Sequence, residues 1–188
     1  MTTPAATGRF YGKYRATVVQ NVDPERRGRL QLLIPDALGL VPSTWAEACA
    51  PLAGPTGPAM GVYLVPPIGA GVWAEFEHGD LNYPIWSGCR WGAQADIPLA
   101  ALSGNPADPS IVIQSLQQHA IVVSDMPSST PPPVMPPVPP TGGVVVKSAT
   151  GASIVVNDAG VFISNGKGAT ISMVGPTITV NNGALVIT

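Results

Sequence analysis

The sequence predicts an all-β protein in two parts: a small N-terminal barrel, then a C-terminal β-helical fibre formed by three intertwined chains. Two observations carry this prediction. Residues 145–188 follow a period of eight, in which short β-branched runs alternate with corners of Gly, Asn or Pro. Residues 9–92 hold short strand-like runs, among them 61–65, 72–77 and 83–91, separated by Gly- and Pro-rich turns, without a convincing helix, which is typical of a small closed barrel. Glu75 and Glu77 alternate within one of these runs, so we expect them to share a face of that strand.

The period of eight favours three chains over one. A single-chain β-helix needs roughly three such strands for each turn, so the octads of one chain give fewer than about two turns and no closed interior. Three identical chains that each supply one strand per turn remove this difficulty. The octads therefore predict a triple-stranded β-helical homotrimer, and a flat antiparallel meander packed on a neighbouring domain stays open as the alternative.

The octad register also predicts which side chains pack inside the fibre. Its third position carries four aliphatic residues that we expect to point inward, namely Val155, Ile163, Ile171 and Ile187. The last octad stops in mid-strand, without a charged or proline terminator, at Leu185, Val186, Ile187 and Thr188. We expect these four residues to present unpaired strand ends and apolar side chains that bind a capping partner.

Composition and charge exclude several classes of function. The net charge is -2 and charged residues make up 11% of the chain, so nothing indicates nucleic-acid binding or attachment to a membrane surface. Residues 48–74 carry no charge, but their prolines exclude a membrane-spanning helix. Residues 1–8 lack the basic start and apolar core of a signal peptide, so we expect synthesis in the cytoplasm.

No catalytic, cofactor-binding or metal-binding motif is present in the sequence. His78 and His119 are isolated and have no metal-ligand spacing with Cys or another His. Cys49 and Cys89 are most simply buried thiols of a cytoplasmic product. Arg26, Arg27 and Arg29 cluster near a turn without an obvious aromatic platform for a nucleic acid. We therefore expect a protein that is not an enzyme, with no cofactor and no metal.

A duplication lies between the two parts of the chain. Residues 111–125 align with residues 144–158, and each copy is expected to form two strands around a polar turn. A proline-rich loop, residues 127–143, separates the copies, and its composition favours an extended conformation. We expect it to be an exposed loop, with a docking strap for a neighbouring subunit as the alternative.

These motifs together resemble a known family. The Asp23-Pro24…Gly28-Arg29 turn and the run from Pro67 to Gly88 are similar to the oligonucleotide/oligosaccharide-binding-type (OB-type) barrel of central baseplate spike proteins. Such spikes occur in contractile phage tails (baseplate assembly protein V), as VgrG in type VI secretion, and in extracellular injection systems. Residues 165–181 are similar to the β-helical needle of the same proteins. The resemblance covers roughly residues 9–92 and 111–188.

The resemblance implies a non-enzymatic homotrimer that pierces the target envelope when a sheath contracts. It implies a baseplate hub protein at the barrel end, a PAAR-like tip protein at the needle end, only transient contact with the target membrane, and a place in a virion tail or injection particle. The expected parts are an N-terminal arm (1–8), the barrel (9–92), a linker (93–110) and the needle (111–188). Two other functions stay open: a trimeric tail fibre or adhesin, and a barrel that binds oligosaccharide or nucleic acid.

Overall fold

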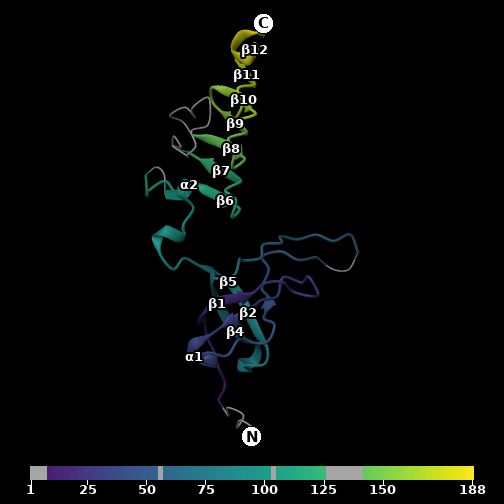
Figure 1. The fold of residues 1–188 in the computed structure, drawn as a ribbon, viewed down its shortest axis with the longest axis vertical. Helices are drawn as coiled ribbons and strands as arrows, with labels where there is room; N and C mark the ends of the chain where they lie inside the picture. The colour runs from purple at the N-terminus through teal and green to yellow at the C-terminus, as the bar shows by residue number, and fades with distance from the viewer. Residues whose placement is uncertain (1–7, 55–56, 103–104, 126–141) are drawn as a thin grey trace. The chain divides into compact units, whose positions relative to one another are not determined.

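The structure is a computed structural model that describes residues 8–54, 57–102, 105–125 and 142–188. The chain divides into two compact units, Met1–Gly92 and Ala93–Thr188. Apart from helical turns of three or four residues, both units are built from strands, so the all-β prediction is confirmed (Figure 1). Within the described residues, no helix has the length and apolar character needed to cross a membrane.

The first unit is a closed barrel. Its strands are β1 (Tyr14–Gln20), β2 (Gln31–Leu33), β3 (Glu47–Ala48), β4 (Gly71–Phe76) and β5 (Pro84–Arg90), in the order β2-β1-β4-β5-β3. β3 runs parallel to β5, and the other neighbours are antiparallel. The ring closes between β2 and β3 because Leu30 and Ala46 exchange two backbone hydrogen bonds of 3.1 and 2.7 Å.

Alternating residues of these strands fill the barrel. β4 shows the pattern most clearly, since Val72, Ala74 and Phe76 are buried while the residues between them are half-buried. The other buried members of this core are Ala16, Val18, Leu30, Leu32, Ile34, Ala46 and Trp86. Two short helices, α1 (Pro35–Leu38) and η1 (Glu77–Gly79), connect the strands.

Two expectations for this unit are wrong. Gly61–Val65, expected as a strand, forms only an isolated bridge between Gly61 and Ala53. Glu77, expected to share a strand face with Glu75, begins η1 instead, where His78 has a φ of 52° and turns the chain out of the strand.

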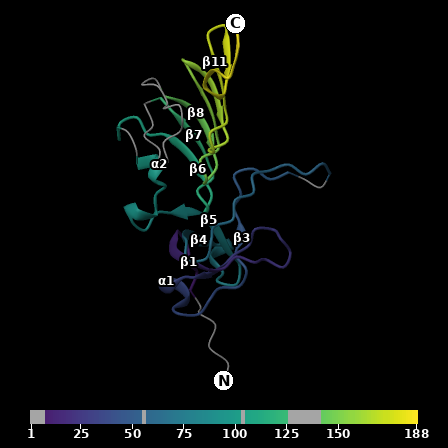
Figure 2. The ribbon, with the colours of Figure 1, turned by 45° about the horizontal axis from the view of Figure 1, so that its top comes forward.

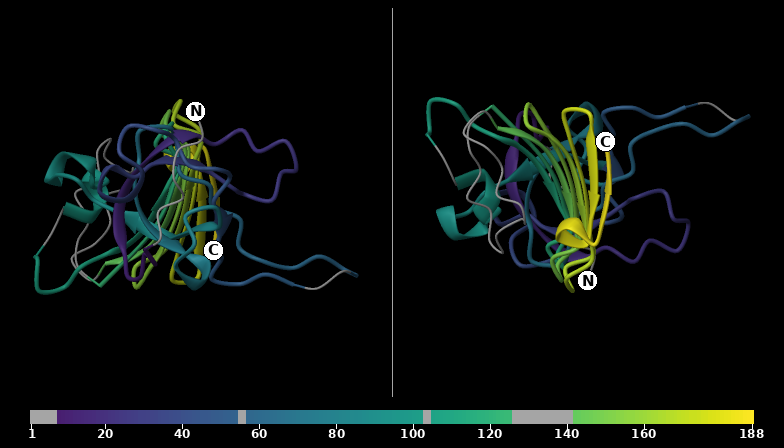
Figure 3. Two further views of the ribbon diagram at one scale, coloured as in Figure 1. Left: turned by 90° about the horizontal axis from the view of Figure 1, so that it is seen from below. Right: turned by 90° about the horizontal axis from the view of Figure 1, so that it is seen from above.

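The second unit is one eight-stranded antiparallel sheet. Its strands are β6 (Ile111–Gln114), β7 (Ala120–Ser124), β8 (Gly143–Lys147), β9 (Ser153–Asn157), β10 (Gly160–Ser164), β11 (Thr170–Val174), β12 (Thr177–Val180) and β13 (Leu185–Ile187). Each strand pairs with the next along the chain, in the order β13 to β6, and the sheet twists progressively (Figures 2 and 3). The turn η3 (Asn181–Gly183) joins the last two strands.

Residues 93–110, expected as a linker, belong to this second unit. They contain η2 (Gln94–Asp96) and α2 (Leu99–Leu102). Ala100 of α2 is 3% exposed and packs in the same apolar cluster as residues of the sheet.

Three hairpin turns share one geometry, which confirms the duplication and adds a third copy. Ser115, Ser148 and Asn165 each donate a backbone N–H to the residue four positions on, at 2.8 to 3.1 Å. In each turn the residue three positions after this donor has a positive φ: Gln118 (66°), Gly151 (95°) and Gly168 (104°). Short turns of this kind join antiparallel neighbours within one chain.

The strand pairing describes a single chain as an antiparallel meander. The octads predict that each chain adds one strand per turn to a helix shared by three chains. Within one chain, however, the structure pairs each strand with the next one along the sequence. The winding of three chains around one axis stays a prediction. The proline-rich loop lies, but for its last two residues, outside the described residues, as does most of the N-terminal arm.

Candidate assembly face of the C-terminal sheet

One face of the eight-stranded sheet is made entirely of aliphatic side chains and one methionine. Residues paired directly across neighbouring strands lie on the same face of a sheet, so the printed registers define two continuous rows. The first row is Ile113, Ile121, Val146, Ile154, Ile163, Ile171, Val180 and Leu185. The second row is Ile111, Val123, Val144, Val156, Val161, Met173, Ile178 and Ile187. We call these sixteen residues the assembly face.

The assembly face is open to solvent in the single chain. Twelve of its residues are exposed, from Val123 at 37% to Ile111 at 66%, and the other four are half-buried. None of the sixteen is charged or carries a hydrogen-bonding side chain. Contiguous exposed apolar patches of more than a few hundred Å² are rare on monomers and mark interaction sites. This face therefore has the character of an interaction surface.

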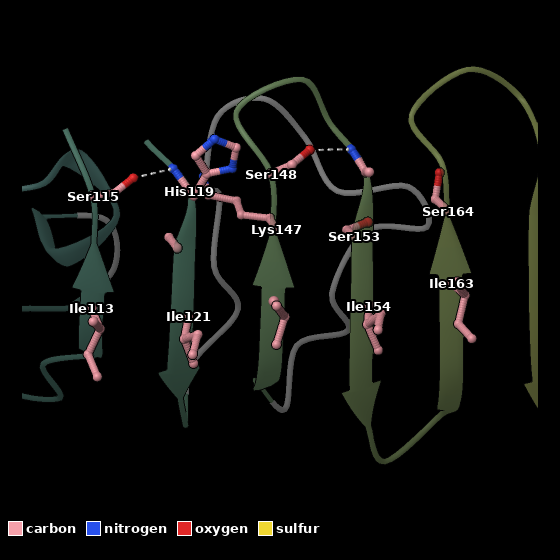
Figure 4. A pocket seen from close by; sticks show the side chains of 13 residues that line it. Ile113, Ser115, His119, Ile121, Lys147, Ser148, Ser153, Ile154, Ile163 and Ser164 are labelled. Carbon is pink, nitrogen blue, oxygen red and sulfur yellow. Dashed lines mark hydrogen bonds between the residues drawn. The ribbon is translucent and has the colours of Figure 1, made fainter. Parts of the chain in front are cut away.

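The part of the first row that lies on β6 to β10 forms a shallow hollow. Ile113, Ile121, Ile154 and Ile163 stand on neighbouring strands along this hollow (Figure 4). The strand register places Val146 between Ile121 and Ile154. Polar residues, among them Ser115, Ser148 and His119, lie only at the ends of the strands (Figure 4). Small-molecule sites need a few convergent polar groups, and the floor of this hollow has none. The hollow therefore suits apolar packing.

The opposite face has a different character. Its middle row runs Val112, Val122, Val145, Val155, Phe162, Ser172, Thr179 and Val186, so it changes from apolar to mixed at β11. Val122, Val145 and Val155 are at most 1% exposed within the single chain. Lys147 lies on this face and is 8% exposed, and burial lowers the pKa of its ammonium group. The β7 to β9 part of this face is thus covered within the single chain, whereas Val174 and Val186 on the same face are 48% and 50% exposed.

The four residues expected to pack inside the needle do not share a face. Ile163 and Ile171 are direct partners in the first row of the assembly face, and Ile187 lies in the second row. Val155 lies on the opposite face and is fully buried in the single chain. The reason is the spacing across turns: Ile163 pairs with Ile171, eight residues on, but Ile154 pairs with Ile163, nine residues on. That odd step moves the third octad position from one face to the other.

Most of the assembly face was not predicted from the octads. The signal was present in the individual strands, because β6 to β9 each place aliphatic residues at alternating positions, as in Ile111-Val112-Ile113. In these strands the residue between two assembly-face residues is also apolar. Alternation of apolar and polar residues therefore could not tell the two faces of the sheet apart.

The expected tip residues form the last strand and its end. β13 pairs with β12 only, and Leu185, Val186 and Ile187 are 50–55% exposed. Leu185 and Ile187 belong to the assembly face, while Val186 points to the opposite side. Thr188 is exposed as well. Binding of a tip protein here stays a prediction.

In the barrel, Arg29 of the arginine cluster is engaged by neighbouring side chains. The guanidinium of Arg29 donates to the carboxylate of Asp23 at 2.7 Å and lies 5.8 Å from the ring of Trp45. Arg29 is thus held by Asp23 within the barrel, so it is not a free member of a basic cluster. No group of three or more His, Cys, Asp or Glu that could hold a metal occurs in the described parts of the chain.

The expectation of two buried thiols is wrong. Cys49 and Cys89 are free and exposed. Cys49 lies just beyond the short strand β3, and Cys89 follows a register irregularity in the pairing of β4 with β5. Neither residue therefore continues the alternation that points every second side chain into the barrel.

Comparison with protein families matches both units. Residues 14–91 match the type VI secretion system/phage-baseplate injector OB domain, which covers the barrel. Residues 110–186 match the phage baseplate V C-terminal trimerisation domain, which covers the sheet that carries the assembly face. Comparison with curated proteins found no match. With an injector OB domain followed by a baseplate trimerisation domain over most of its length, the chain belongs to the phage baseplate V family, the central spike proteins of contractile injection systems.

Proposed function

We propose that three copies of this chain form the central spike of a contractile injection machine, with the assembly faces of the three sheets packed around one axis as a needle. The needle pierces the target envelope when the sheath contracts and carries a tip protein at the β13 end. The barrel end attaches to a baseplate hub protein, and the spike becomes part of a virion tail or injection particle. A structural baseplate component that assembles as a homotrimer is what the two family matches support directly.

The observation that carries the proposal is the composition of the assembly face. Sixteen apolar side chains in two rows cover the whole face, and the trimerisation-domain match spans the strands that bear them. A closed arrangement of three sheets covers all three faces at once, because each sheet then faces the other two. Burial of apolar surface is worth roughly 25 cal/mol per Å², so a face of this size strongly favours association.

A needle of this kind also suits mechanical work. Eight strands per chain form continuous ladders, so an axial load is shared among many backbone hydrogen bonds. Backbone groups are satisfied within the sheet, whose edges are its two end strands, β6 and β13. The side chains of the assembly face supply cohesion and no reactive group, which agrees with a structural role.

The test is the oligomeric state of the protein and of two matched variants. Light scattering should give about three times the chain mass of 19.3 kDa. Ile163→Asp should abolish the trimer, because it buries three like charges in an apolar interior. Asn165→Asp, two residues along in the turn, should leave it intact, because a carboxylate keeps the oxygen that accepts hydrogen bonds from the N–H groups of Lys167 and Ala169.

Three outcomes contradict the proposal. A monodisperse monomer of the wild-type protein is the first. A trimer that survives Ile163→Asp unchanged is the second, because the assembly face would then not be the interface. Greater damage from Asn165→Asp than from Ile163→Asp is the third.

A further inference from the structure

A two-stranded arm leaves the barrel between β3 and β4, and residues 50–54 and 57–65 of it are described. Val62 donates its N–H to the carbonyl of Leu52 at 3.0 Å, and Gly54 donates its N–H to the carbonyl of Met60 at 2.7 Å. This pairing places the side chains of Leu52, Met60 and Val62 on one side of the arm. The arm is the long blue loop that extends from the barrel in Figure 1.

That side of the arm is apolar and open. Leu52 is 47% exposed, Val62 43% and Met60 58%. A Cβ on Gly54 would lie 2.5 Å from Cγ of Met60, so the methionine lies directly across the glycine and widens the apolar strip. The arm lies inside the charge-free stretch of residues 48–74. A two-stranded ribbon is marginally stable in water, so an apolar strip on such a ribbon indicates a contact that holds it.

The barrel carries a second uncharged apolar patch. Leu40 is 85% exposed and Val41 is 66% exposed, in the turn that follows α1. Residues 37–46 contain no charged side chain. α1 and the arm lie on opposite sides of the barrel in Figures 1 and 2. One chain therefore presents two complementary apolar patches that its own fold does not bring together.

We propose that the arm of each barrel docks on the Leu40–Val41 turn of the neighbouring copy, so that the three barrels close into a ring. In a cyclic trimer each copy meets its neighbours head to tail, so each needs two different patches that fit each other. The arm strip and the Leu40–Val41 turn are such a pair, because both are apolar and both lie in charge-free stretches. A charged partner surface would instead meet patches that offer it no counter-charge.

The proposal rests on the trimer of the proposed function, so the experiment measures the two separately. In a background of Cys49→Ser and Cys89→Ser, both at exposed positions, Leu40→Cys and Val62→Cys are combined in one chain. Light scattering first establishes the trimer. A short bis-maleimide should then join the barrels, and a denaturing gel should show covalent trimers.

Three matched controls make the result specific. Leu40→Cys alone and Val62→Cys alone should stay monomeric on the gel. Val62→Cys combined with Val22→Cys should also stay monomeric, since Val22 is 72% exposed but lies in the turn between β1 and β2. A protein that is trimeric in solution but whose Leu40→Cys/Val62→Cys chains stay monomeric on the gel overturns the ring. Dimers from Val62→Cys alone, which would mean that arms pair with arms, or equal cross-linking through Val22→Cys, also overturn it.

Discussion

Asp23 organises the turn between β1 and β2 with a single carboxylate. Its side chain is 2% exposed and accepts hydrogen bonds from the backbone N–H groups of Glu25, Arg27 and Arg29. The guanidinium of Arg29 holds the pKa of this carboxyl well below its usual range, and the three backbone hydrogen bonds act in the same direction. We predict that Asp23→Asn lowers the melting temperature of the barrel, because the partly buried Arg29 then loses its main counter-charge.

The same pKa shift predicts a pH dependence. A lowered carboxyl pKa contributes stability that is complete above the unfolded value of about 4 and is lost as the pH falls toward the folded value. Wild-type melting should therefore fall on acidification below about pH 4, and Asp23→Asn should flatten that fall. All four tryptophans lie in residues 1–92, so tryptophan fluorescence reports the barrel alone. Glu25→Gln is the control, because that carboxylate is 57% exposed; an equal effect of Glu25→Gln would contradict the role of Asp23.

Single residues also show how far the sequence could predict the assembly face. Ile163 and Ile171 were predicted to pack together, and they are direct cross-strand partners. Val155 was assigned to the same set but lies on the opposite face. The octads fix the identity of the apolar residues, but the face that each one occupies depends on the length of every turn before it. A single odd step, at Asn157–Gly160, is enough to separate Val155 from Ile163.

Among the elements, the hairpin turns were the easiest to predict and are the most sharply testable. The turns after β8 and β10 lie against each other at Gly166, where an added Cβ would lie 2.7 Å from the carbonyl carbon of Gly151. Gly166 also has a φ of 71°, whereas Gly168 has a φ of 104° and open space around it. We predict that Gly166→Ala destabilises the sheet more than Gly168→Ala does.

Comparing the two substitutions separates the cost of backbone strain from the cost of steric overlap between the turns. Both carry the cost of a positive φ for a residue with a Cβ, roughly 1–2 kcal/mol. Only Gly166→Ala adds overpacking against backbone, typically about 1–3 kcal/mol more. Thermal unfolding followed by far-ultraviolet circular dichroism should rank wild type, Gly168→Ala and Gly166→Ala in falling order. Equal melting of the two variants would mean that the two turns do not touch.

The barrel elements were predicted about as well as local patterns allow. β4 and β5 begin and end within one residue of the expected runs 72–77 and 83–91, and β4 alternates between buried and half-buried residues along its whole length. Gly61–Val65 looked like a strand from its composition, but strand formation requires a neighbour, and the arm pairs only with itself around Ala53 and Gly61. Ring closure between Leu30 and Ala46 depends on contacts distant in sequence, which no local pattern contains.

At the scale of the whole molecule, the sequence predicted a trimer from the shortness of its octads, and the structure adds a physical reason for one. The single chain completes the pairing of its strands but leaves the assembly face open. The number of partners that cover this face cannot follow from the pattern of one chain, because a meander satisfies the same ladders in a monomer as in a trimer. The trimerisation-domain match supplies that number.

The needle end provides the last prediction. β13 hydrogen-bonds to β12 on one side only, and Leu185, Val186 and Ile187 expose half or more of their surface. Exposed strand edges with apolar side chains are normally covered, so we propose that this end binds a PAAR-like tip protein. Deletion of residues 185–188 should remove that binding while leaving seven strands and most of the assembly face. We expect an intact trimer by light scattering and loss of co-purification with a PAAR-like protein encoded near this chain. Loss of the trimer would instead mean that β13 is needed for assembly, and unchanged co-purification would place the tip protein elsewhere on the spike.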